Sequence, residues 1–405
     1  MTRKSGLRGG LPWDFYGIAF SGFLFEMGLF MTQPILTLHY LDVGASIMFI
    51  GFIIFLQSSL LIVLRMPLTL LAKRVGEKRL LAAAYFAQTL ALIVIGLAPS
   101  PIWLYLVPAT QMLASGSFFQ LITSMNSNQA PLERQGDALG RHMTIVSIGM
   151  FVGPALCGVL VTSLGYRDVF YVASVFPAAG LALLLYSTRG IESAGHALRN
   201  FEVPSFTSLK VLFSDRNVAI LAFIRAIYSI SNTLLLTLLS IYVVRVLGYS
   251  PTDAALLYAL VGIANTFIKI PSGWVSDRVG YRLVLFATFS IVVVDYLAFA
   301  YFNSFILLAL AVTFFRACWG ARAVTEWAFL ASFISPGLKS IAMGYMESFW
   351  DMGASLGSLL AGVAAGVLSY PTIFTLLALL NLPTLPAIYA LRKPSKTIEI
   401  EPKPI

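Results

Sequence analysis

Charged residues are scarce in this chain. They make up 11% of its 405 residues, and 58% of the residues are hydrophobic, whereas soluble domains carry roughly 25% charged residues. Too little polar surface remains to cover a soluble protein of this length. The composition therefore excludes a soluble globular protein and indicates one that lies in a membrane.

Residue types that hold metals, disulfides and nucleotides are also few. The two cysteines, Cys157 and Cys318, fall in apolar segments, and the three histidines are isolated, so neither a disulfide framework nor a metal cluster is expected. No G-x-x-x-x-G-K-S/T loop occurs, which argues against direct use of ATP. We therefore expect no cofactor, no metal, no nucleic-acid partner and no enzymatic activity.

Long apolar runs dominate the sequence instead. Each can cross about 30 Å of hydrocarbon as a helix that rises 1.5 Å per residue. Twelve such runs lie at about 13–40, 46–68, 80–98, 101–126, 139–163, 168–187, 217–245, 252–273, 282–301, 304–334, 340–368 and 371–391. The predicted fold class is an all-α membrane protein with twelve transmembrane helices.

Basic residues predict the orientation of these spans. If the N-terminus is cytoplasmic, twenty of the 27 lysines and arginines fall on inner segments, and only Arg167 and Arg245 fall on outer loops. Inner loops carry such an excess. We expect a multi-pass protein of the cell membrane with both termini in the cytoplasm, the lipid bilayer around it, and a monomeric state.

The chain also repeats itself. A shift of 204 positions aligns seven glycines with glycines, beginning with Gly44 on Gly248 and Gly76 on Gly280, where chance gives about one such pair. Six spans precede the centre, so the second half enters the membrane in the orientation of the first. The predicted architecture is two parallel, pseudo-symmetric six-helix bundles, which is typical of secondary transporters.

Domain boundaries follow from the repeat and from one long polar connection. We expect an N-terminal bundle over 1–187, a cytoplasmic linker over 188–216, a C-terminal bundle over 217–392 and a cytoplasmic tail over 393–405.

Two inner loops carry a matched signature. The second has Gly273, Asp277, Arg278, Gly280 and Arg282, and it resembles the G-x-x-x-D-R-x-G-R/K-R/K loop of the major facilitator superfamily. Two further segments resemble motifs of that family: Gly149, Gly153 and Pro154 match its glycine-rich antiporter motif, and Arg316 with Gly320 matches its R-x-x-x-G motif. A basic turn that only fixes topology is the alternative reading of the loops.

The resemblance implies rigid-body rocking of two bundles, with these motifs acting in gating. The first loop departs from the pattern, because Lys73 stands where the aspartate belongs, although Arg74 and Gly76 are retained. Met112 likewise replaces the arginine of span four, which weakens any proton-coupling role borrowed from that arginine. The asymmetry predicts a latch at Asp277 and none at Lys73.

Charges within the spans are the candidate functional residues. Each costs about 2.5–3.5 kcal/mol at a helix centre unless it pairs or faces water. Counting residues from the turn between spans ten and eleven places Arg322 level with Asp351 and Glu326 level with Glu347. Arg225 reaches a similar depth. The alternatives are a cavity-lining network, which we favour, and a structural clamp.

Glu26 lies alone in the middle of the first span. Burial disfavours the charged form of a carboxylate, which makes Glu26 a candidate proton site; a hydrogen bond to the backbone, Gln33 or Gln111 is the alternative. The predicted substrate or proton pathway comprises Glu26, Gln33, Arg225, Asn232, Arg316, Trp319, Arg322, Glu326, Glu347 and Asp351. Lys269 is expected only to extend its ammonium group to the membrane surface.

These observations predict a secondary transporter that moves a small molecule by alternating access. Proton-coupled efflux of amphipathic compounds is favoured. The alternatives are proton-coupled uptake or exchange of an organic anion or a sugar-like solute and, in another class, a non-transporting membrane receptor or scaffold.

Overall fold

The computed structural model describes residues 11–127, 129, 135–189, 214–334 and 336–392, and these residues are helical with no β-strand. The predicted all-α class is confirmed. The first half contains α1 (Trp13–Asp42), α2 (Ile47–Val75), α3 (Glu77–Leu97), the short η1 (Pro101–Tyr105), α4 (Leu106–Ser127) and α5 (Gln135–Ser187). The linker over 190–213 and the tail over 393–405 lie outside the described residues.

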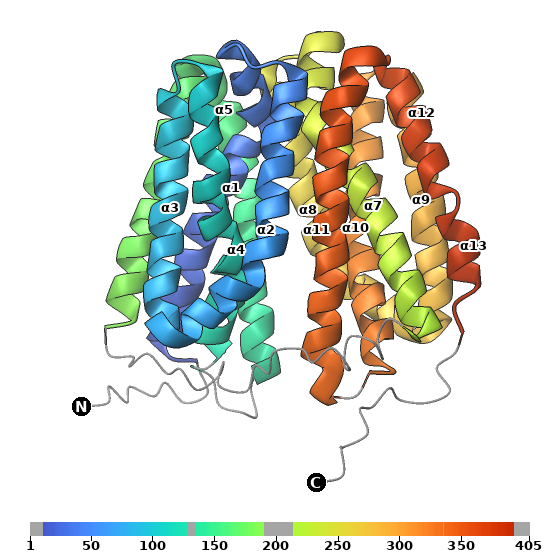
Figure 1. Ribbon diagram of the computed structural model, residues 1–405, viewed down its shortest axis with the longest axis horizontal. Coiled ribbons are helices and arrows are strands. Elements are labelled where there is room, and N and C mark those ends of the chain that lie inside the picture. The colour runs from blue at the N-terminus through green and yellow to red at the C-terminus, as the bar shows by residue number, and fades with distance from the viewer. Residues whose placement is uncertain (1–10, 128, 130–134, 190–213, 335, 393–405) are drawn as a thin grey trace. The chain divides into compact units, whose positions relative to one another are not determined.

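The second half repeats this order of helices (Figure 1). It contains α7 (Arg216–Ile241), the short η3 (Tyr242–Val246), α8 (Pro251–Val279), α9 (Tyr281–Tyr301), α10 (Phe305–Ala331), α11 (Pro336–Val367), α12 (Tyr370–Asn381) and α13 (Thr384–Tyr389). Side-chain oxygens cap some of these helices, because the first backbone N–H groups of a helix lack partners. Asp215, for example, accepts from the backbone N–H of Val218 at 3.0 Å.

Each of the twelve apolar runs corresponds to helical structure. Helix α5 holds two of them, because Gly165 interrupts its helical geometry with a φ of 77°. The last run is divided into α12 and α13. Among the described residues, nine helices are long and apolar enough to cross a membrane.

The internal repeat is visible in the backbone. Of the described glycines with positive φ, Gly44 and Gly248 have values of 90° and 77°, and Gly76 and Gly280 have values of 98° and 92°. A side chain is disfavoured at such angles, so glycine permits the tight turn at each position. Each of these two turns of the first half therefore has an equivalent turn 204 residues later, at the spacing found in the sequence.

Helix packing repeats as well. A Cβ on Gly149 or Gly153 of α5 would lie 2.6–2.8 Å from backbone atoms of α1, including those of Met27. The equivalent Gly353 and Gly357 of α11 approach the α7 backbone equally closely, and a Cβ on Gly357 would meet the backbone oxygen of Ile230. Small residues allow membrane helices to pack at such short separations. The glycine motif thus fixes α1 on α5 and α7 on α11.

The described residues form two compact units, and each has its own core. Unit 1 comprises Met1–Phe201 and Val243–Gly262, and unit 2 comprises Glu202–Tyr242 and Ile263–Ile405. In unit 1, Phe25 stacks on Phe118 with ring centroids 3.6 Å apart. In unit 2, Tyr228 and Phe315 stack at 6.1 Å. The domain boundaries expected from the sequence remain a prediction.

Candidate substrate and proton pathway

A buried group of charges joins three helices of unit 2. Arg225 of α7 donates to Glu326 of α10 at 3.1 Å and to Glu347 of α11 at 2.5 Å. Arg225 is 5% exposed, Glu326 is fully buried and Glu347 is 32% exposed. A single guanidinium therefore brings together the two carboxylates that the sequence places at one depth.

Arg322 completes this group, which we call the charge network: Arg225, Arg322, Glu326 and Glu347. Arg322 lies four residues before Glu326 on α10 and donates to its second oxygen. Residues four apart share one helix face. Two cations and two carboxylates balance, so the network as a whole is neutral and does not by itself attract an anion.

Aromatic rings enclose the cations of the charge network. The Arg225 guanidinium carbon lies 4.6 Å from the Trp327 ring centroid, and that of Arg322 lies 4.6 Å from the Tyr228 ring centroid. Trp350 lies within 5.9 Å of both. The faces of aromatic rings attract cations, more strongly where water is excluded. The rings thus hold both guanidinium groups in place while their charges remain paired.

Asp351 is buried one turn beyond Glu347 on α11 and is close enough to attract Arg225 electrostatically. The hydrogen-bonded carboxylate partner of Arg322 is Glu326 of its own helix. The pairing of Arg322 with Asp351 stays a prediction.

A second cationic cluster in unit 2 surrounds Trp319. Arg316 donates to the side-chain oxygen of Asn232 at 3.0 Å, and its guanidinium carbon lies 4.6 Å from the Trp319 ring centroid. On α8, the Lys269 ammonium lies 5.9 Å from the same ring. Two cations therefore share one indole.

Glu26 lies on the face of α1 that packs against α5. A Cβ on Gly149 would lie 3.0 Å from the Glu26 Cβ. The Glu26 side chain is partly exposed and makes no hydrogen bond or ion pair with any residue that the structure describes. Its backbone is fixed, and its carboxylate is available to a proton or a cationic group.

Gln33 lies two turns further along α1, at a small polar cavity of unit 1. The cavity has a volume of about 140 Å³, and its lining includes Thr32, Gln57 and Gln111 from α1, α2 and α4. Amide and hydroxyl groups can donate or accept hydrogen bonds there. Gln57 gives no signal in the sequence, since a single glutamine in an apolar run has many roles.

The matched loops lie at the α2–α3 and α8–α9 turns. In the second, Tyr281 donates to Asp277 at 3.3 Å, and Arg278 stacks on Trp274 at 3.6 Å. In the first, Arg74 is exposed, and the side chain of Lys73 lies outside the described residues. A Cβ on Gly273 would lie 3.5 Å from a side-chain carbon of Val324, which is an ordinary van der Waals contact. The latch expected at Asp277 therefore remains a prediction.

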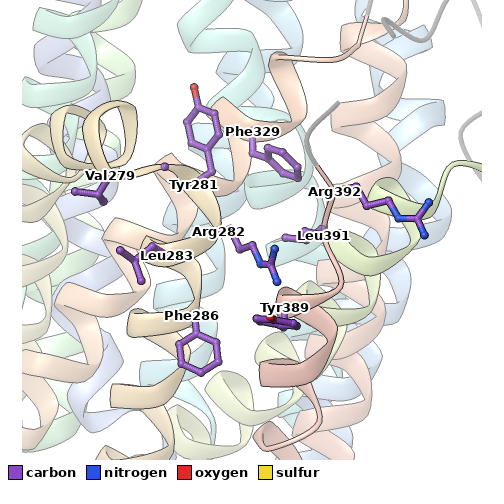
Figure 2. Close-up of a pocket in the computed structure, with 10 residues that line it drawn as sticks. Val279, Tyr281, Arg282, Leu283, Phe286, Phe329, Tyr389, Leu391 and Arg392 are labelled. Carbon is purple, nitrogen blue, oxygen red and sulfur yellow. The ribbon is translucent and has the colours of Figure 1, made fainter. Parts of the chain in front are cut away.

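Arg282 of the second loop lies beside a concave region of about 740 Å³ in unit 2. Figure 2 shows its side chain directed toward Tyr389 of α13, whose ring centroid lies 4.0 Å from the guanidinium carbon. Phe286, Phe329 and Leu391 also line the region. The motif residue Arg282 thus ties the start of α9 to α13.

The arrangement of helices, glycine contacts and loops can be compared with known proteins. The sequence profile of the Major Facilitator Superfamily matches residues 18–336, with a second, overlapping match over 221–404. The chain belongs to the Major Facilitator Superfamily. The resemblance predicted from the motifs is confirmed.

Curated relatives of this facilitator include transport proteins of several bacteria. Multidrug resistance protein MdtG of Rahnella sp. (strain Y9602) is 24% identical over 318 residues, which cover 77% of this chain and 76% of the relative. A multi-drug resistance efflux pump PmrA homolog of Lactococcus lactis subsp. lactis (strain IL1403) is 28% identical over 313 residues, 74% of each chain.

Solved structures share the facilitator fold. The nucleoside transporter NupG matches with a TM-score of 0.80 at 13% identity, over 94% of this chain and 99% of that chain. A bacterial homolog of the human lysosomal transporter Spinster matches with a TM-score of 0.75 at 14% identity, over 94% and 96%. At these identities the likeness shows the fold alone. The facilitator is a membrane transporter of small molecules and not an enzyme.

The structure also identifies polar residues that the predicted pathway does not include. Lys269 lies ten residues before the end of α8, roughly 15 Å inside it, and it faces Trp319. Asn265, one turn earlier, is fully buried. Their four-residue spacing on one helix face is the signal that could have linked them. Asp295 of α9, which the predicted pathway does not include, is buried, and one of its oxygens has no hydrogen-bond partner among the described residues.

Proposed function

We propose that this facilitator exports small amphipathic compounds in exchange for protons. The observation that carries the proposal is the position of Glu26, which is fixed by the α1–α5 contact and has no described partner. An ionised carboxylate in an apolar span costs about 2.5–3.5 kcal/mol. A proton or a cationic group removes that cost, so protonation and substrate binding can exclude each other, which is the requirement for exchange.

Similarity supports the direction of transport. The relatives MdtG and PmrA are named for multidrug resistance and efflux, and the glycine motif at Gly149, Gly153 and Pro154 resembles that of antiporters. We further propose alternating access by rocking of the two bundles, both termini in the cytoplasm, and a monomer as the working state. Uptake or exchange of an organic anion is the second candidate, and it is favoured by the cations Arg316 and Lys269 around Trp319.

Transport by purified protein in liposomes tests the proposal. The lumen holds a pH-sensitive dye. Three probes that share a naphthalene ring but differ in charge are added in turn: the anion 2-naphthalenesulfonate, the neutral 2-naphthalenesulfonamide and the cation 2-naphthyl-trimethylammonium. Exchange predicts that entry of at least one probe moves protons in the opposite direction. Proton movement in the same direction as the probe would instead establish the uptake candidate.

Glu26→Gln is the matched test of the proton site. The variant should fold and bind the probe, but an imposed pH gradient should no longer drive transport. Asp168→Asn, at an exposed carboxylate of α5, is the control and should behave as the parent. Gradient-driven transport by Glu26→Gln at the parental rate would remove Glu26 from the proposal.

A further inference from the structure

The cluster around Trp319 brings two cations together. Lys269 and Arg316 place two positive charges at one indole ring, at 5.9 and 4.6 Å from its centroid. Lys269 makes no ion pair with a carboxylate in the part of the chain that the structure describes. Like charges that share a site repel each other, and a bound anion would turn that repulsion into attraction.

Buried polar groups of the same cluster also lack partners. The Trp319 indole N–H has no hydrogen-bond partner among the described residues, and neither does the side-chain N–H₂ or oxygen of Asn265. Asn265 is fully buried. Buried donors are nearly always satisfied, and an unsatisfied one calls for a water, an ion or a ligand. Trp319 and Asn265 thus contribute two unmet N–H donors to a cluster that is already positive.

A close helix contact keeps these groups together. A Cβ on Gly320 of α10 would lie 2.9 Å from the backbone oxygen of Asn265 and 2.5 Å from Ile268. Glycine at position 320 therefore lets α8 and α10 meet at the cluster. Asn232 of α7 holds Arg316 from the other side at 3.0 Å. Arg316 is therefore held in the cluster by a hydrogen bond to a neutral side chain and by the Trp319 ring.

From this geometry we infer that Lys269, Arg316, Trp319 and Asn265 form an anion-binding subsite, which recognises a sulfonate or carboxylate group attached to a flat apolar body. Lys269 and Trp319 are partly exposed, whereas Arg316 and Asn265 are buried. The indole offers a face to the apolar body, and the ammonium and guanidinium groups offer hydrogen bonds to the anion. The inference rests on the second candidate of the proposed function, transport of an organic anion, and gives that anion a flat apolar body.

The charge network explains why this cluster, and not the other arginines, selects an anion. Arg225 and Arg322 are paired with Glu326 and Glu347 in equal number. An anion that approached Arg225 would compete with two carboxylates already in place. At Lys269 an anion meets a cation and unmet donors.

Binding of matched probes tests the subsite. The protein is placed in phosphatidylcholine nanodiscs, where no anionic lipid competes. Its unfolding temperature is measured at increasing concentrations of 2-naphthalenesulfonate and, separately, of neutral 2-naphthalenesulfonamide, and the affinity for each probe is obtained from the increase. The sulfonate should bind at least about tenfold more tightly, because hydrogen bonds to charged groups are the strong ones. Lys269→Gln should abolish this preference, Lys269→Arg should keep it, and Trp319→Phe should weaken it.

Arg189→Gln is the control, because Arg189 also lies over an aromatic ring, that of Tyr186 at 5.1 Å, but outside the cluster. It should keep the parental preference. Equal affinity of the parent for the sulfonate and the sulfonamide would overturn the inference. A sulfonate preference that is undiminished in Lys269→Gln would also overturn it. If Lys269→Gln fails to fold, an undiminished preference in Trp319→Phe would do the same.

The two proposals fail separately. A sulfonate preference without proton-linked transport in liposomes would remove the proposed function and leave the subsite. Proton-linked transport with no loss of charge preference in Lys269→Gln would do the reverse.

Discussion

Neutralising one member of the charge network should destabilise the protein strongly, and neutralising an opposite pair should not. Glu326 accepts from both Arg225 and Arg322 and is fully buried. Glu326→Gln leaves two guanidinium groups with Glu347 as the remaining hydrogen-bonded carboxylate. Removal of one partner from a buried ion pair costs about 3–5 kcal/mol, and Arg322→Gln should cost a similar amount because it leaves Glu326 in excess.

The double variant Arg322→Gln, Glu326→Gln retains one cation and one carboxylate, Arg225 and Glu347, which lie 2.5 Å apart. It is neutral again. Additive losses would place it roughly 6–10 kcal/mol below the parent, whereas a shared charge balance predicts a loss no larger than that of either single variant. The coupling free energy should therefore be at least about 3 kcal/mol.

Unfolding free energy measured in bicelles by titration with SDS provides the cycle. The exposed pair Asp137 and Arg141 on α5 has the same four-residue spacing and an N–O distance of 2.7 Å, but its side chains are 38% and 49% exposed, respectively. Its cycle should show coupling near the measurement error, because water screens exposed pairs. Additive losses in the Arg322–Glu326 cycle would show that the members of the charge network do not share one charge balance.

Two further predictions concern local contacts of unit 1. Gly153→Ala should lower the unfolding free energy by about 1–3 kcal/mol, because its Cβ would lie 2.6 Å from a backbone oxygen of α1; Gly140→Ala, with nothing within 4 Å, should have little effect in the same titration, and equal effects would contradict the packing argument. Cysteines that replace Asp42 and Arg245, whose side-chain ends meet at 2.5 Å, should be joined by a bis-methanethiosulfonate reagent about as long as the two lost side chains, because a direct disulfide requires much closer Cβ atoms. An absence of cross-linking would show that the ends of α1 and η3 separate in the membrane.

Length and glycine spacing carry most of the fold. An apolar run long enough to span a bilayer forms a helix because hydrocarbon leaves its backbone groups no other partners. The turns at Gly76 and Gly280 are predictable because both glycines precede a run and recur at a fixed spacing. The interruption of α5 at Gly165 likewise lies between the runs 139–163 and 168–187 that the sequence separates.

The site is only partly predictable. Residue counts from a turn give depth along a helix, because each residue rises 1.5 Å, and the counts place Glu326 level with Glu347. In the structure both carboxylates contact Arg225. The choice of partner also depends on how each helix is rotated about its axis. For Lys269 the position near the end of an apolar run suggested the membrane surface, but α8 continues to Val279 and turns the ammonium group toward Trp319. Such rotations are set by packing between helices, so the sequence of one helix does not reveal them.

The duplication shows that the helix arrangement does not require the charge network. In unit 1, at the shift of 204 positions, apolar or small residues occupy all four of its places, namely Ser21, Phe118, Ile122 and Met143. These positions pack well, since Phe118 stacks on Phe25 and Ile122 is fully buried. The same helix arrangement is therefore stable without charges at these four positions, and a purely structural clamp gives no reason for unit 2 to keep them.

Transplanting the unit 1 residues tests this argument. The variant Arg225→Ser, Arg322→Phe, Glu326→Ile, Glu347→Met removes two cations and two carboxylates together, so no charge is left unpaired within the network. Replacement of buried ion pairs by packed apolar groups is often neutral or stabilising by about 1–4 kcal/mol. We expect an unfolding free energy no lower than that of the parent, together with loss of proton-linked transport in liposomes. A folded variant that still transports at the parental rate would show that the network serves packing alone, and the functional assignment of its four residues would fall.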